Sequence, residues 1–145
     1  EAQVVLPRFA GDLVAMLAEA AAGRLRPGTA WHARSAVTVV LASEGYPAAP
    51  RTGDVIDGVD DAKARSGVTV YCAGVGADAE GRLITAGGRV LAVTGMGDDL
   101  GAARQRAYEA ITHISWPGMQ YRRDIAGDAV RAAAEPPPEK RKEHV

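Results

Sequence analysis

A run of β-branched and apolar residues at positions 36–42 constrains the fold of this chain more than any other feature. The run reads AVTVVLA, and apolar residues occupy both its odd and its even positions. A strand with this pattern is expected to be buried on both faces. Further β runs follow at residues 68–73, 82–86 and 89–94. The central part of the chain is therefore predicted to form a β-sheet.

Turn chemistry predicts how two of these runs are joined. Gly87 and Gly88 separate the runs at 82–86 and 89–94, and a Gly-Gly pair between two β runs is typical of a hairpin. Residues 54–64 predict a short strand and a helical turn.

Helical periodicity is found on both sides of the β region. Residues 7–22 carry apolar side chains at helical spacing, and Gly23 would end that helix. Residues 23–34, with Pro27 and Gly28, predict a connection between two structural units. A second helix is predicted over residues 99–114, with one apolar face made of Leu100, Ala103, Ala107, Ile111 and Ile114. This order of helices and strands predicts an α+β fold.

Length, composition and charge limit the class of protein. A chain of 145 residues with 47% hydrophobic residues can form one globular domain with a core. Its 17 basic and 18 acidic residues argue against sequence-independent nucleic-acid binding. No apolar run reaches membrane-spanning length, so a soluble cytoplasmic protein is expected.

Cys72 lies in an apolar run and is predicted to be a buried thiol. Residues 131–145, rich in Pro and charge from 135 onward, predict a disordered tail.

Three places could bind an anion or another ligand. Arg122 and Arg123 follow a Trp-Pro-Gly break, and guanidinium forks match a phosphate group. A short Arg-Arg pair is more often solvated surface, and these residues alone favour that interpretation. The loop at 43–47 ends the strongest strand, so a ligand loop and an ordinary Gly-Pro turn are equally good interpretations. Residues 87–89 combine close backbone approach with one cation, although a hairpin alone explains their glycines.

Other kinds of site find little support. Residues 95–99 lie between a strand and a helix, where phosphate loops occur, but Asp98 and Asp99 at the helix start favour capping instead. The histidines are scattered, and no Cys, His or Asp cluster has metal-ligand spacing. The acidic residues within 57–61 lack the calcium-loop pattern and predict a solvated turn.

The order of these segments is more specific than any one of them. Together they resemble the C-terminal third of the phosphoribosylamine–glycine ligase family. The chain departs from the family pattern at Glu44 and at Ala126, where glycine is usual. The resemblance is carried by residues 3–8, 12–14, 36–47 (ending in Gly-Tyr-Pro), 53–58, 73–74, 87–91 (Gly-Gly-Arg-Val-Leu), 93–98, 108–111 and 118–125 (Gly-Met-Gln-Tyr-Arg-Arg-Asp-Ile).

The resemblance implies a fold and a reaction. Residues 1–25 would be the end of an ATP-grasp domain, and residues 26–130 a C-terminal domain of the rudimentary single-hybrid type, an antiparallel or mixed β-sheet with packed helices. The implied enzyme joins glycine to 5-phosphoribosylamine through a glycyl phosphate, hydrolyses ATP to ADP and phosphate, and yields glycinamide ribonucleotide for purine biosynthesis. Mg²⁺ or Mn²⁺ neutralises the transferring phosphoryl group in such a reaction.

The same resemblance implies that this chain is a fragment. The metal ligands are expected just upstream of Glu1, and the nucleotide-binding lysines further upstream. The chain would then hold no catalytic residue or metal ligand, and it would be inactive without the remainder of the ligase chain.

Analogy with related purine ATP-grasp enzymes suggests a substrate site. In those enzymes a basic pair near the C-terminus holds a ribose 5-phosphate, so Arg122 and Arg123 become candidates for holding that of phosphoribosylamine. The residues implied to line the same site are Gly45, Tyr46, Pro47 and Arg89. The alternative is a non-enzymatic ligand-binding or interaction module with this fold. A biotin or lipoyl carrier is disfavoured, because the turn at 87–88 has no lysine to modify.

Overall fold

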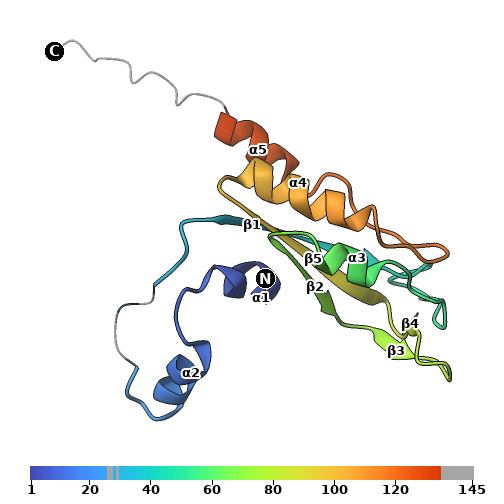
Figure 1. Cartoon of the computed structure of the whole chain (residues 1–145), viewed down its shortest axis with the longest axis horizontal. Helices are drawn as coiled ribbons and strands as arrows, with labels where there is room; N and C mark the ends of the chain where they lie inside the picture. Colours follow the sequence, from blue (N-terminus) through green and yellow to red (C-terminus); the bar gives the residue numbers. More distant parts are fainter. Residues whose placement is uncertain (26–27, 29, 135–145) are drawn as a thin grey trace.

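A three-stranded sheet with a long helix on one face forms the body of the molecule, and a two-stranded sheet extends from one end (Figure 1). The computed structural model describes residues 1–25, 28 and 30–134. All strand pairs are antiparallel, as the α+β prediction allowed. The elements are α1 Ala2–Val5, the 3-10 helix η1 Leu6–Arg8, α2 Leu13–Ala21, β1 Ser35–Ala42, α3 Val59–Lys63, β2 Val68–Cys72, β3 Val75–Ala77, β4 Leu83–Thr85, β5 Arg89–Gly97, α4 Leu100–Ile111 and α5 Gly127–Ala134.

The main sheet has the order β1-β5-β2, so β5 is its central strand. Val39 pairs with Val93, which pairs in turn with Val70, and all three side chains are buried. The opposite face of β1 is more open, because Val40 is 43% exposed. The prediction that this strand is buried on both faces is therefore wrong. Only one face of β1 is covered along its length, by α4.

Two glycines allow α4 to lie close to β5. A Cβ atom on Gly95 would lie 2.3 Å from the carbonyl oxygen of Ala103, and one on Gly97 would lie 2.4 Å from the Ala103 nitrogen. Both glycines lie within β5, so residues 95–97 continue the strand. Asp99 then caps α4 by accepting a hydrogen bond from the Ala102 N–H at 2.7 Å. The capping interpretation is confirmed.

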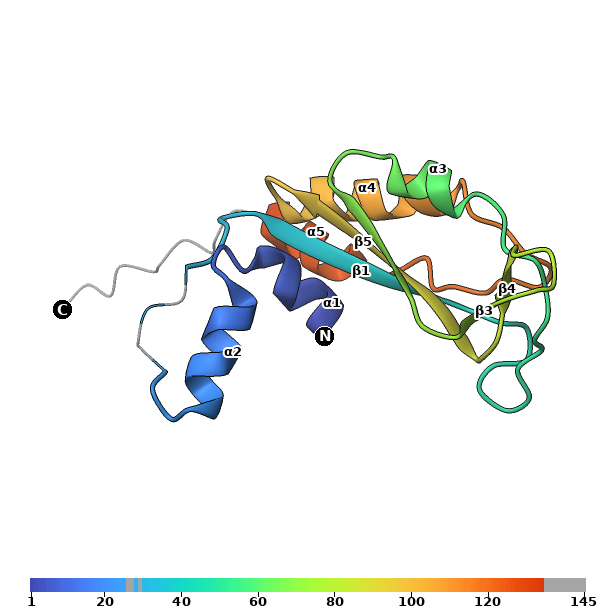
Figure 2. The same ribbon diagram turned by 60° about the horizontal axis from the view of Figure 1, so that its bottom comes forward.

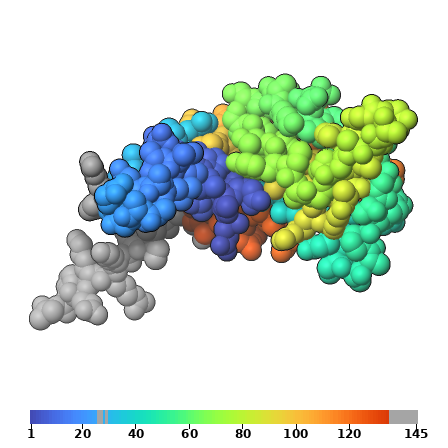
Figure 3. Space-filling view, turned by 90° about the horizontal axis from the view of Figure 1, so that it is seen from below, coloured from blue at the N-terminus to red at the C-terminus, as the bar shows by residue number. Residues whose placement is uncertain are grey.

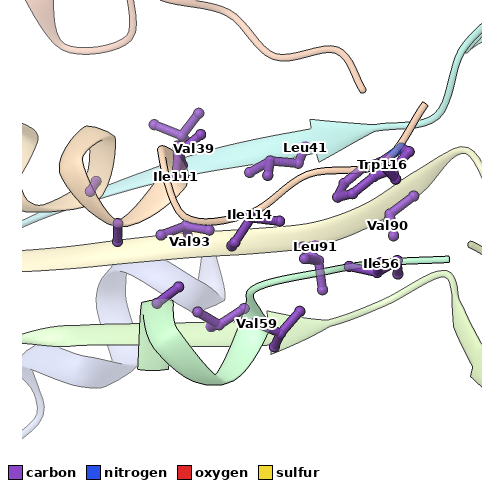
Figure 4. Packing of buried hydrophobic residues seen from close by; sticks show 14 of the residues in the cluster. Val39, Leu41, Ile56, Val59, Val90, Leu91, Val93, Ile111, Ile114 and Trp116 are labelled. Atoms are coloured by element: carbon purple, nitrogen blue, oxygen red, sulfur yellow. The ribbon is translucent and has the colours of Figure 1, made fainter. Parts of the chain in front are cut away.

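The hydrophobic core lies between the main sheet, α4 and the segment that follows α4. Figure 4 shows side chains from β1, β5 and the residues around Ile114 and Trp116 pointing toward one another. Leu41, Leu91 and Ile111 are almost completely buried. The predicted apolar face of the second helix is confirmed: Ala103, Ala107, Ile111 and Ile114 are buried and Leu100 packs partly against them.

The predicted hairpin at Gly87 and Gly88 is wrong. The strand before these glycines, β4, pairs with β3, whereas the strand after them, β5, pairs with β1 and β2. The glycines instead allow close approach between backbones and rings. A Cβ atom on Gly74 would lie 2.8 Å from the Gly87 Cα, and one on Gly88 would lie 2.3 Å from the Tyr46 ring. A Gly-Gly pair serves a tight turn and a close contact equally well, so the sequence could not distinguish them.

The real hairpin of the small sheet forms at residues 78–82. The Asp78 carboxylate accepts hydrogen bonds from the backbone N–H groups of Glu80 and Arg82, at 3.1 and 2.8 Å. Gly81 has a φ of 81°, a conformation that glycine adopts readily. An aspartate that bonds its own turn in this way is a recognised turn former.

The N-terminal segment contains two short helices, η1 and α2, instead of the one helix predicted over residues 7–22. α2 begins at Leu13, because Asp12 caps it by accepting from the Ala15 N–H at 2.9 Å. It ends at Ala21, and Gly23 follows with a φ of 68°, as predicted. None of the residues of α2 is buried, and Val14 is 77% exposed. In Figure 3 this N-terminal part forms a blue lobe at one end of the molecule.

α1 packs on the face of the main sheet opposite α4 (Figure 2). The Thr94 hydroxyl donates to the Gln3 carbonyl oxygen at 3.0 Å and lies 2.6 Å from the Thr38 hydroxyl. Adjacent strand residues point to opposite faces. Thr94 contacts α1 and the neighbouring Gly95 contacts α4, so the two helices lie on different sides of the sheet.

The remaining predictions have mixed outcomes. The helical turn within 54–64 is α3, while the strand expected there is reduced to isolated bridges at Val55 and Asp57. Cys72 is exposed, because it ends an edge strand, so its predicted burial is wrong. Residues 131–134, assigned to the tail, are the last turn of α5.

Part of the chain lies outside the described residues: positions 135–145 of the expected tail, and positions 26, 27 and 29 of the expected connection. In the described part, no helix combines the length and the hydropathy needed to cross a membrane.

Replacing Gly95 with alanine should lower the free energy of unfolding by about 3 kcal/mol, since the new methyl group overlaps backbone atoms of α4 that cannot move independently. Urea denaturation monitored by circular dichroism measures the change. Gly76→Ala is the matched control, because its Cβ would meet no atom closer than 3.5 Å. Equal unfolding free energies for the two variants would contradict this account of α4 packing.

Candidate functional site

A pocket of about 460 Å³ lies over residues 38–42 of β1, on the face of the sheet opposite α4. Its wall is mostly apolar, and two arginines stand in it. The residues that matter for its chemistry are Thr38, Val40, Tyr46, Arg89, Tyr121 and Arg122. Three of the six residues predicted for the substrate site, Tyr46, Arg89 and Arg122, are thus brought together from three distant parts of the chain.

Backbone hydrogen bonds position the two sides of the pocket. Ala42 and Gln120 exchange N–H···O bonds of 2.8 and 2.9 Å, which place the segment of Tyr121 and Arg122 beside β1. On the other side, the fully buried Ser43 donates its hydroxyl to the Gly87 carbonyl at 2.8 Å. This bond ties the loop that carries Tyr46 to the residues just before Arg89.

A β-bulge decides which way Arg89 points. Leu41 pairs with Leu91, but the next residue of β1, Ala42, pairs with Arg89, so Val90 is an extra residue in β5. A bulge shifts the alternation of side chains along a strand. Without it, Arg89 would share the α4 face with Leu91. With it, Arg89 shares the pocket face with Ala42, and Val90 is buried completely in the core.

The guanidinium of Arg89 is free to bind a ligand. The side chain is exposed, and within the described chain it forms no hydrogen bond or ion pair. A planar guanidinium with unused N–H donors is suited to bidentate binding of a phosphate or carboxylate.

Arg122 already has an anionic partner. Its Nε and Nη2 donate to the two carboxylate oxygens of Asp124, at 2.9 and 2.5 Å. These hydrogen bonds lower the pKa of Asp124 and raise the pKa of Arg122. Both side chains are largely exposed. The rim of the pocket therefore carries two cations, Arg89 and Arg122, and one anion, Asp124.

The remaining predicted residues do not contribute to the pocket wall. The Arg123 guanidinium lies over the Tyr121 ring, 5.6 Å from its centroid. Gly45 and Pro47 flank Tyr46 in its loop. Gly45 has a φ of 78°, and a Cβ atom there would lie 2.3 Å from the Ala49 carbonyl oxygen, so this glycine is required by the turn.

The described residues do not fit a metal centre. A second hollow of about 380 Å³ is lined by Asp57, Asp60 and Asp61 together with Arg82. Nevertheless, no group of three or more His, Cys, Asp or Glu side chains in the described part could hold a metal ion.

Comparison with known proteins identifies the family. The model of the family described as "Phosphoribosylglycinamide synthetase, C domain" matches residues 36–128. The chain belongs to this family. Every residue of the pocket named above lies within the matched range, so the pocket is a feature of the synthetase C domain and not of the N-terminal segment.

The relatives share most of this chain but are much longer. Phosphoribosylamine–glycine ligase of Streptomyces coelicolor is 46% identical over 135 residues, which are 91% of this chain and 32% of that protein. The chloroplastic ligase of Arabidopsis thaliana is 43% identical over 133 residues, 90% of this chain and 25% of that protein. The crystal structure of the Thermotoga maritima ligase superposes with a TM-score of 0.72 at 35% identity, covering 86% of this chain and 30% of that one. The chain spans about a quarter to a third of these proteins.

The comparisons confirm the family and the α+β, antiparallel architecture of the synthetase C domain. The division at residues 25 and 26, the ATP-grasp origin of the first segment and the single-hybrid type stay predictions. The sequence analysis missed Thr38, Val40 and Tyr121 as pocket residues. Tyr121, next to Arg122, could have been inferred from its neighbour. Nothing in the sequence indicates that Val40 faces a pocket, since it is one of several similar residues in its run.

The pairing of Arg122 with Asp124 makes a titration prediction. Replacing Arg122 with glutamine removes the hydrogen bonds that favour the carboxylate, so the pKa of Asp124 should rise toward its ordinary value. The native pair stabilises the fold above the ordinary pKa of aspartate, and that contribution is lost as the pH falls through the lowered value. Carboxyl ¹³C NMR measures the shift. Arg123→Gln is the matched control and should leave the pKa of Asp124 unchanged, because Arg123 lies over Tyr121; an equal rise in both variants would contradict the assignment.

Proposed function

We propose that this chain is the C-terminal part of a phosphoribosylamine–glycine ligase. The complete enzyme joins glycine to 5-phosphoribosylamine, hydrolyses ATP to ADP and phosphate, passes through a glycyl phosphate and yields glycinamide ribonucleotide. The observation that carries the proposal is the similarity of about nine-tenths of the chain to proteins named as this ligase, at 43 to 46% identity. We assign the binding of ATP and of Mg²⁺ or Mn²⁺ to the remainder of the ligase.

Within that enzyme, the role of the pocket is to hold the phosphorylated ribose. Arg89 supplies the free guanidinium, which can form two parallel hydrogen bonds to one phosphate. Arg122 adds positive charge at the same rim, although Asp124 occupies two of its N–H groups. The two cations outweigh the single carboxylate, so the rim attracts an anion.

The apolar part of the pocket contributes to the same role. Val40 and the aromatic rings of Tyr46 and Tyr121 present surfaces that exclude water from the contact. Charge–charge attraction is stronger where less water separates the partners. Holding the phosphate at one end fixes the position of the amine at the other, which reduces the entropic cost of bringing it to the glycyl phosphate.

A complete ligase polypeptide that contains these residues should form glycinamide ribonucleotide only when ATP, glycine and phosphoribosylamine are all present. Changing Arg89 to glutamine in that polypeptide should raise the KM for phosphoribosylamine about 10- to 100-fold, the loss expected for a hydrogen bond to a charged group. The KM for ATP should stay within about twofold, because the nucleotide binds elsewhere. Steady-state kinetics with each substrate varied in turn measures both constants.

Two further variants make the test specific. Arg65→Gln removes an exposed arginine that does not line the pocket, and its kinetics should match those of the unaltered enzyme. Arg123→Gln should have a smaller effect than Arg89→Gln. A complete polypeptide without ligase activity would overturn the proposed reaction. A large effect of Arg123→Gln with none for Arg89→Gln would place the phosphate on the other side of Tyr121.

A further inference from the structure

One guanidinium outside the pocket connects the two segments that form its walls. Arg51 donates from Nε to the Asp54 carboxylate at 2.9 Å and from Nη1 to the Glu44 carboxylate at 2.5 Å. Its Nη2 donates to the carbonyl oxygen of Pro117 at 2.9 Å. Three acceptors from three positions of the chain thus share a single side chain. A guanidinium can satisfy them together because its donors point in fixed, divergent directions.

The first wall is the loop that carries Tyr46. Arg51 closes this loop twice, since its backbone N–H donates to the Glu44 carbonyl at 2.9 Å and its side chain binds the Glu44 carboxylate. Inside the loop, the Ala49 N–H donates to the Gly45 carbonyl at 2.9 Å. Tyr46 therefore lies in a loop that Arg51, at its far end, closes by binding Glu44 at its near end.

The second wall is the segment that carries Tyr121 and Arg122. This segment starts at the turn of Pro117 and Gly118, where Gly118 has a φ of 72°. A Cβ atom on Gly118 would lie 2.6 Å from the Glu44 Cβ, so the turn packs directly against the Glu44 side chain. The bond from Arg51 to the Pro117 carbonyl fastens the turn in this place.

We infer that Arg51 is a positioning residue that sets the distance between the Tyr46 wall and the Arg122 wall of the pocket. This inference rests on the proposed function. Arg51 itself does not line the pocket, and it acts through the two segments that it joins. Glu44 takes part in the same cluster. The carboxylates of Asp54 and Glu44 together exceed the single positive charge of Arg51, and their hydrogen bonds, that of Asp54 foremost, raise the pKa of the guanidinium.

Changing Arg51 to methionine keeps much of the side-chain length and removes all three hydrogen bonds. In the complete ligase, the KM for phosphoribosylamine should rise about two- to fivefold, a size typical of exposed ion pairs. The kcat and the KM for ATP should stay unchanged, because nothing that touches the nucleotide is altered. Arg51→Lys should not restore the KM, because an ammonium cannot reach three divergent acceptors. If Arg51 only stabilised the fold, Arg51→Met would lower the amount of active enzyme and leave the KM for phosphoribosylamine unchanged.

Hydrogen–deuterium exchange tests the connection directly in this chain. In Arg51→Met, the backbone amides of residues 49 and 51 should exchange faster, while those of β5 keep their protection. Arg82→Met is the matched control, because Arg82 also binds two carboxylates, those of Asp78 and Glu80, but at the turn of the β3–β4 hairpin and not at a wall of the pocket. Its KM and its exchange at residues 49 and 51 should equal those of the unaltered protein.

The outcomes separate this inference from the proposed function. If Arg89→Gln raises the KM for phosphoribosylamine and Arg51→Met does not, the pocket binds the substrate but Arg51 does not position its walls. Faster exchange without a change in KM likewise overturns the positioning role. If neither variant changes the KM, the substrate does not bind in this pocket, and both proposals fail. If Arg51→Met raises the KM and Arg51→Lys does not, the positive charge at position 51 is sufficient. That result would overturn the role of the three hydrogen bonds.

Discussion

The close contact between β5 and α4 is the constraint on which the rest of this structure depends. β5 is the central strand, and two of its residues are glycines whose missing side chains let the helix backbone lie almost directly on the strand. The contact buries most of one face of the sheet and uses the only long helix among the described residues to do so. At one end, the opposite face is covered by the short helices α1 and η1. An open region remains over β1, and this region is where the pocket forms.

The walls of the pocket come from loops and not from regular elements. The loop after β1, the turn before β5 and the segment after α4 meet at the end of the main sheet, and each is held by a few hydrogen bonds to another. A rigid sheet with loops gathered at one end is a common arrangement for ligand binding. Here the loops also decide the electrostatics, because Arg122 is paired with Asp124 while the guanidinium of Arg89 has no partner among the described residues.

The sequence predicted the elements well and their contacts poorly. The long strands and the second helix could be located because their apolar residues repeat with the period of the element. The hairpin predicted at Gly87 and Gly88 is wrong, since a glycine pair does not show whether it turns the chain or makes room for a neighbour. The predicted burial of Cys72 is wrong because strand position and not residue type decides burial at an edge. For the site, the analogy with related purine ATP-grasp enzymes indicated Tyr46, Arg89 and Arg122, but the pairing of Arg122 with Asp124 depends on rotamers that a sequence does not record.

Because of the bulge at Val90, the side of the sheet on which Arg89 lies depends on strand pairing as well as on residue identity. Side chains alternate along a strand, so Arg89, two residues before the core position Leu91, would lie on the helix side of the sheet if the bulge were absent. A relative could keep every residue type of this segment and, by pairing it without the bulge, present valine to the pocket and turn its arginine toward the helix. The placement of Arg89 on the pocket side is therefore encoded partly in how β5 pairs with β1, and an alignment gap opposite the bulge matters as much as a substitution.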